Sequence, residues 1–80
     1  MRELVEYIAL SLVENPDEVV VTEHVERDRV VVRLQVASED MGKVIGKEGR
    51  IAQAMRTLMK VAATSEGLQP FLVIGPTTPQ

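Results

Sequence analysis

Residues 44–52 read Val-Ile-Gly-Lys-Glu-Gly-Arg-Ile-Ala, and their two glycines, Gly46 and Gly49, frame a Lys-Glu pair. Glycine is used where the backbone needs a positive φ or where another molecule must approach it closely. The segment after Gly49 has helical periodicity, and the first N–H groups of a helix lack internal partners and lie at the positive end of its dipole. Because Lys47 and Arg50 add two positive charges there, the stretch predicts an anion site with phosphate as its ligand.

The composition is that of one small globular domain. The chain has 80 residues, too few for two stable cores, and 45% of them are hydrophobic. It has no cysteine, which excludes a disulfide scaffold and a cysteine zinc site. No apolar run approaches the ~18 residues of a membrane span, and the N-terminus lacks the apolar stretch of a secretory signal. We therefore expect a cytoplasmic protein without membrane insertion.

The charge is divided unevenly along the chain. The net charge is −3, which by itself argues against a polyanionic ligand. Residues 1–40 sum to −6, however, whereas residues 41–80 sum to +3. Since the Debye length is about 8 Å at physiological salt, a ligand at the glycine loop feels mainly the local positive charge. A few specific phosphate contacts are favoured over general adhesion to a duplex.

The spacing of the apolar residues predicts six main elements. Helical periodicity marks residues 2–14 and the segment after Gly49, while alternation over 30–37 marks a strand with one buried face. Asn15-Pro16-Asp17 ends the first helix, and Gly67 supplies a left-handed cap for the last. The predicted elements are a helix over 2–14, strands over 19–25 and 30–37, a short helix over 38–45, a long helix over 51–62 and a strand over 71–74.

The start of the short helix is predicted from its local chemistry. Ser38 supplies a side-chain oxygen for the cap, and Glu39 and Asp40 place carboxylates in the first turn, where the helix dipole favours them. Met41, Met55 and Met59 are expected to fill the core.

This order of elements predicts an α+β fold. The strands joined at residues 26–29 form an antiparallel hairpin, whereas the two-helix excursion allows the third strand to pair in parallel. A three-stranded mixed sheet with three helices on one face follows, and the neighbour of the third strand is left open. The domain is expected to span residues 1–75, with a flexible C-terminal tail over 76–80.

A short helix, Gly-x-x-Gly and a longer helix set between strands resemble the signature of a KH domain, whose loop clamps nucleic-acid backbone. The helix and strand before this core resemble the type II arrangement, and the resemblance covers residues 2–75. Length and the run Asp40–Lys47 are similar to the KhpA family of small stand-alone bacterial KH proteins. The resemblance implies binding of single-stranded RNA in the cytoplasm, an RNA chaperone or post-transcriptional regulatory role, self-association as a dimer, and pairing with a larger KhpB-like partner.

The resemblance also assigns the RNA-binding residues. The loop is Gly46, Lys47, Glu48 and Gly49, and the adjoining groove is lined by Ile45, Arg50, Ile51 and Ala52. About four unpaired nucleotides fit such a domain. Glu48 departs from the most basic loops and is expected to pair with a neighbouring cation or to point to solvent. Lys43 is either a further phosphate contact or a solvated helix charge.

Other interpretations of the glycine loop are weaker. A tight interhelical turn needs glycine for geometry alone. A P-loop does not fit, because the spacing from Gly42 is one residue short and Glu48 stands where Ser or Thr should hold magnesium. Arg56 and Lys60, four residues apart, are interpreted as the wet face of the long helix, and His24 as a strand surface residue.

Two classes of function remain. The first is a non-enzymatic module that binds single-stranded RNA with low sequence specificity. The alternative is a protein-interaction module with a KH fold in which RNA binding is incidental. An enzyme is not expected, because the chain has no pattern of nucleophile and base, no metal cluster and no cofactor fingerprint.

Overall fold

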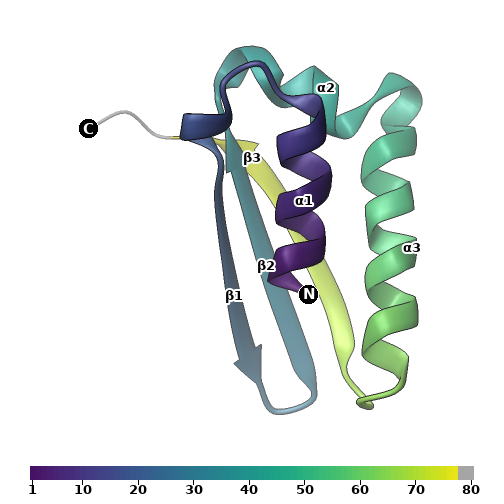
Figure 1. Cartoon of the computed structure of the whole chain (residues 1–80). Helices are drawn as coiled ribbons and strands as arrows, with labels where there is room; N and C mark the ends of the chain where they lie inside the picture. The colour runs from purple at the N-terminus through teal and green to yellow at the C-terminus, as the bar shows by residue number, and fades with distance from the viewer. Residues whose placement is uncertain (78–80) are drawn as a thin grey trace.

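The computed structural model describes residues 1–77 (Figure 1). Helices and strands follow one another in the predicted order, with short 3-10 turns at residues 16–18, 38–40 and 47–49. The elements are α1 (Arg2–Leu12), β1 (Val20–Glu26), β2 (Arg29–Val36), α2 (Met41–Ile45), α3 (Arg50–Thr64) and β3 (Gln69–Pro76).

The strands form one mixed sheet in the order β1-β2-β3. β1 pairs with β2 in antiparallel register, from Val20 opposite Gln35 to Glu26 opposite Arg29. β3 pairs with β2 in parallel. This confirms the predicted α+β type II KH arrangement, and it places the third strand beside the second, which the sequence left open.

The helices lie on one face of the sheet and leave the other face bare (Figure 1). On β2, Val30, Val32, Leu34 and Val36 are all buried under the helices, as their alternation predicts. Met55 and Met59 of α3 pack into the same core, whereas Met41 is only half-buried against it. The core therefore lies between the central strand and the helices, and α2 with the glycine loop lies at one end of it.

The last strand differs most from the sequence prediction. β3 begins at Gln69 and continues to Pro76, so it is longer than the four apolar residues that predicted it. Thr77 then donates its backbone N–H to Val36 and its hydroxyl to the Glu18 carbonyl, at 2.7 and 2.9 Å. The remainder of the predicted tail, residues 78–80, lies outside the described residues.

Candidate functional site

The glycine loop reverses the chain between α2 and α3 by means of unusual backbone angles. Gly46 has φ 80° and ψ 170°, a combination that is almost restricted to glycine. Glu48 and Gly49 follow in the left-handed region, with φ 56° and 73°. The N–H of Gly46 donates to Gly42 at 2.9 Å, and that of Gly49 donates to Gly46 at 3.0 Å. These bonds make the loop a compact turn that opens directly into α3.

Gly46 is also required for space. A Cβ at this position would lie 2.6 Å from Cγ1 and 3.0 Å from Cβ of Ile51, distances at which one of the two groups must move. At Gly49 a Cβ would meet nothing within 4 Å, so only its positive φ favours glycine. The two glycines therefore have different roles: Gly46 lets the loop backbone rest on Ile51, and Gly49 permits the turn into the helix.

We predict unequal costs for replacing the two glycines. Gly49→Ala should destabilise the domain by about 1–2 kcal/mol, the cost of holding an L-residue in the left-handed region. Gly46→Ala should cost about 2–5 kcal/mol, because it adds overpacking against Ile51. Urea unfolding of both variants measures the difference. Equal costs would mean that Ile51 moves aside without penalty.

The charges of the loop are partly paired. The Arg50 guanidinium contacts the Glu48 carboxylate at 3.1 Å, as expected for Glu48, and both side chains are largely exposed. A surface pair of this kind contributes little to stability. Lys47 is exposed and forms no salt bridge within residues 1–77. Lys47 is thus the unpaired cation of the loop.

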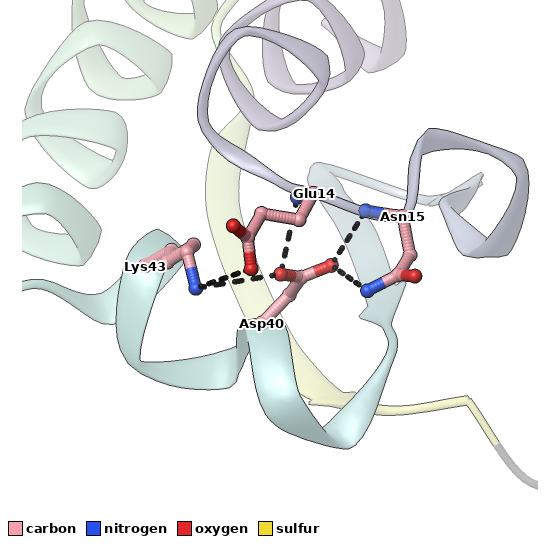
Figure 2. A network of polar contacts seen from close by, with 4 residues as sticks. All are labelled: Glu14, Asn15, Asp40 and Lys43. Atoms are coloured by element: carbon pink, nitrogen blue, oxygen red, sulfur yellow. Dashed lines mark hydrogen bonds and ion pairs between the residues drawn. The ribbon is translucent and has the colours of Figure 1, made fainter.

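Lys43 on α2 forms ion pairs with two carboxylates outside the glycine loop. Its ammonium lies 3.4 Å from Glu14 Oε1 and 3.8 Å from Asp40 Oδ1 (Figure 2). Among the apolar positions, Ile45 and Ile51 are half-buried and pack against the core, so each keeps some surface beside the loop. Ala52 is only 4% exposed and belongs to the core. The structure therefore brings Ile45, Ile51, Lys47 and Arg50 together at the loop, while Lys43 is tied to the end of α1.

The end of α2 nearest α1 is fixed by a buried carboxylate, Asp40, which is 0% exposed. It accepts hydrogen bonds from the backbone N–H groups of Glu14 and Asn15 and from Asn15 Nδ2, each at 3.1 Å (Figure 2). The predicted cap from Ser38 is wrong: no side-chain cap bond is present there, and Asp40 turns back to the chain after α1. Asp40 thereby holds the helix that carries the glycine loop.

Burial by itself raises the pKa of the Asp40 carboxyl, but other contacts outweigh it. The hydrogen bonds from Glu14 and Asn15, together with the Lys43 ammonium, stabilise the ionised form, so the pKa lies below its ordinary value. A depressed carboxyl pKa contributes stability that is fully present above the unfolded-state pKa and is lost as the pH falls through the folded-state pKa. The network is therefore complete at neutral pH.

We predict that Asp40→Asn lowers the midpoint of thermal unfolding at pH 7 by about 5–10 °C, because an amide cannot accept all of these hydrogen bonds. The difference from the wild-type chain should begin to shrink as the pH falls below about 4, where the carboxyl of the unfolded chain takes up a proton, and should be lost only at a lower pH, where the folded-state carboxylate is protonated too. Asp17→Asn, which removes an exposed carboxylate, serves as the control at pH 7. A difference that stays constant down to pH 2 would contradict this assignment.

A second feature was missed from the sequence, a pocket between α3 and the edge strand β3. Its volume is about 320 Å³, and its basic residues are Arg56 and Lys60, which were interpreted as a wet helix face. Arg56 Nη2 donates to the Leu72 carbonyl at 3.4 Å. The lining residues are Arg56, Met59, Lys60, Gln69, Pro70, Phe71 and Leu72. The spacing of Arg56 and Lys60, four residues apart, showed that the two cations share one side of the helix. The pocket could not be predicted, because the sequence did not show that β3 lies beside them.

The pocket lies farther along α3 from the glycine loop. Arg56 comes six residues after Arg50, about 9 Å along the helix axis. The loop therefore lies at the N-terminal end of α3 and the pocket farther along the same helix, and both present cations.

Within residues 1–77 no group of His, Cys, Asp and Glu side chains is arranged to hold a metal ion. In the same part of the chain, no helix has the length and hydropathy that a membrane crossing requires.

Comparison with known proteins decides the family. The profile described as KhpA/KhpB, KH domain, matches residues 2–74. The chain belongs to this KH-domain family. The RNA-binding protein KhpA of Caldanaerobacter subterraneus is 59% identical over 66 residues, which cover 82% of this chain and 88% of the relative. The RNA-binding proteins KhpA of Clostridium perfringens, 54% identical over the same shares, and of Aquifex aeolicus, 42% identical over 92% and 94% of the two chains, are similar too.

No solved structure gives a significant match to the chain. The KhpA relatives carry the name of RNA-binding proteins, not of enzymes. The family thus agrees with the predicted class, and the residues that would contact RNA are argued below from the geometry.

Proposed function

We propose that this domain holds short single-stranded RNA at the loop formed by Gly46, Lys47, Glu48 and Gly49. The observation that carries the proposal is the loop itself. At Gly49 the backbone has no side chain and nothing lies within 4 Å of where a Cβ would stand, so a sugar-phosphate chain can approach it, and Lys47 is a cation with no salt-bridge partner within residues 1–77. KH domains use such a loop to clamp about four nucleotides.

The RNA is expected to continue from the loop into the groove along α3. Ile45 and Ile51 offer apolar surface for bases next to the loop. Farther along, Arg56 and Lys60 line the pocket beside β3. Arg50 is available for phosphate once it exchanges Glu48 for the ligand, since an exposed pair of this kind is weak. Lys43 stays a candidate contact only if it leaves Glu14.

Sequence specificity is expected to be low. The chain has one Phe, one Tyr and no Trp, and neither aromatic residue lies in the loop. Stacking worth ~1–3 kcal/mol per base is therefore absent at this position. Contacts there are to phosphate, to aliphatic surface and through backbone groups, which discriminate poorly between bases.

A footprint of about four nucleotides is short, so the affinity for RNA rises when a second RNA-binding domain acts together with this one. Joining two RNA-binding units raises avidity through effective concentration without new contacts. This supports action as a homodimer or with a KhpB-like partner, as an RNA chaperone or post-transcriptional regulator in the cytoplasm. The non-enzymatic character follows from the same picture, in which the ligand is held and not transformed.

The alternative, a protein-interaction module, is favoured by one observation. Several large apolar side chains on α1 and α3 are exposed, including Tyr7 at 74% and Val61 at 69%. Such side chains mark an association surface where they form one contiguous patch. The experiment below separates the two functions.

The test is fluorescence anisotropy with a labelled unstructured RNA across a salt series. For the wild-type chain, log K should fall with log salt at a slope of about −2 for phosphate contacts by Lys47, Arg56 and Lys60, at ~0.7 per contact, and of about −3 if Arg50 also leaves Glu48 for phosphate. The double substitution Lys47→Asp with Glu48→Asp should weaken binding at least about tenfold, because it reverses the only unpaired charge of the loop. Arg2→Asp, at the far end of α1, makes the same change in net charge and is the matched control.

Unchanged RNA binding in the loop variant would exclude the loop as the site. If the wild-type chain does not bind RNA, the alternative function, a protein-interaction module, is favoured.

A further inference from the structure

The face of the sheet that carries no helix has a composition that RNA binding at the loop does not explain. This open face is formed by the side chains that alternate away from the core, and Figure 1 shows it uncovered by any helix. It consists of Val20, Thr22, His24 and Glu26 on β1, Arg29, Val31, Arg33 and Gln35 on β2, and Gln69, Phe71, Val73 and Gly75 on β3.

The part of the open face formed by β2 and β3 combines an aromatic ring with two arginines. Phe71, the one phenylalanine of the chain, is 42% exposed, and Val73 beside it is 43% exposed. The Arg29 guanidinium carbon lies 5.1 Å from the centroid of the Phe71 ring, within the range of a cation–π contact. Arg33 pairs across the sheet with Thr22 and Val73, so no carboxylate stands directly beside it.

The acidic first half of the chain does not make this face acidic. Glu23 points to the helix side, where its carboxylate accepts the Arg2 backbone N–H at 2.9 Å. Asp40 is buried at the other end of the core. At the twelve positions of the open face two arginines stand against one carboxylate, that of Glu26. The face is therefore locally positive although the chain is negative.

We propose that the open face is a second contact surface for the same single-stranded RNA. Bases stack on the Arg29 guanidinium, which lies over the Phe71 ring, and Arg33 contacts phosphate. Unpaired bases stack on aromatic side chains and arginine planes, and a sheet surface presenting both is a known way to bind them. The inference rests on the proposed function, since it extends the path of an RNA strand that begins at the glycine loop.

Two observations favour RNA over other occupants. Phe71 also lines the pocket between α3 and β3, so the open face continues from the RNA groove around the edge strand. The positive charge of the face complements phosphate, whereas a second copy of the same face would carry the same net positive charge. The proposal therefore predicts that RNA strands longer than the loop footprint gain affinity from this face.

The experiment compares two unstructured RNAs, of about 4 and about 12 nucleotides, the second long enough to pass the edge strand. Arg33→Gln removes one charge from the open face, and Arg2→Gln makes the same change on α1 as the matched control. Phe71→Leu removes the ring and keeps apolar bulk. We expect Arg33→Gln to weaken the long RNA about threefold and Phe71→Leu about fivefold or more, with the affinity of the short RNA unchanged by Arg33→Gln.

A variant with a fluorescent side chain on the open face tests for RNA contact there without relying on a loss of affinity. The chain has no tryptophan, so Val73→Trp places a single indole on the open face beside Arg33, outside the pocket residues. Its fluorescence should be quenched by the long RNA and not by the short one. Circular dichroism melting shows whether each variant is folded.

The failures are distinguishable. If Arg33→Gln and Arg2→Gln bind the long RNA equally, and the long RNA does not quench Val73→Trp, the open face does not contact RNA. Binding that depends on the glycine loop would then still support the proposed function. A change of oligomeric state in Arg33→Gln without RNA, measured by light scattering, would instead assign the face to a second copy. Absence of RNA binding by the wild-type chain would overturn both proposals.

Discussion

The close approach of Gly46 to Ile51 is the contact on which the rest of this structure depends. The backbone of the loop rests directly on the first turn of α3, with no room for a Cβ between them. This contact holds the loop against α3, and Ile45 and Ile51 beside it are half-buried at the edge of the core. The proposed function uses the same loop, in which Lys47 is exposed and the space beside Gly49 is open.

A helix of five residues cannot hold this arrangement by itself, since isolated short helices are unstable in water. α2 is fixed at both ends: by the glycine turn on one side and by Asp40 on the other. The buried carboxylate ties α2 to the chain after α1 through three hydrogen bonds and to Lys43 through an ion pair. Local strain at the loop is thus compensated by a polar network at the opposite end of the same helix.

The sequence predicted the order of elements, the buried face of β2 and the glycine turn, because each is written in residues that are neighbours along the chain. It did not predict the role of Asp40, whose partners lie about 25 residues away and whose position before a helix is equally typical of a cap. The gathering of Arg29, Arg33 and Phe71 on one face was likewise hidden, since it depends on the neighbour of β3. The sum of charges along the sequence did not reveal that the open face of the sheet is positive, because that depends on which residues share a face.

The central claim is that the glycine loop holds the RNA backbone. The most direct measurement is a titration of the ¹⁵N-labelled wild-type chain with an unstructured RNA of about 4 nucleotides, followed by amide chemical shifts. The account predicts that the largest shifts are those of Gly46 to Arg50, with smaller ones along the side of α3 that faces β3. Large shifts elsewhere with the amides of residues 46–50 unmoved would contradict it.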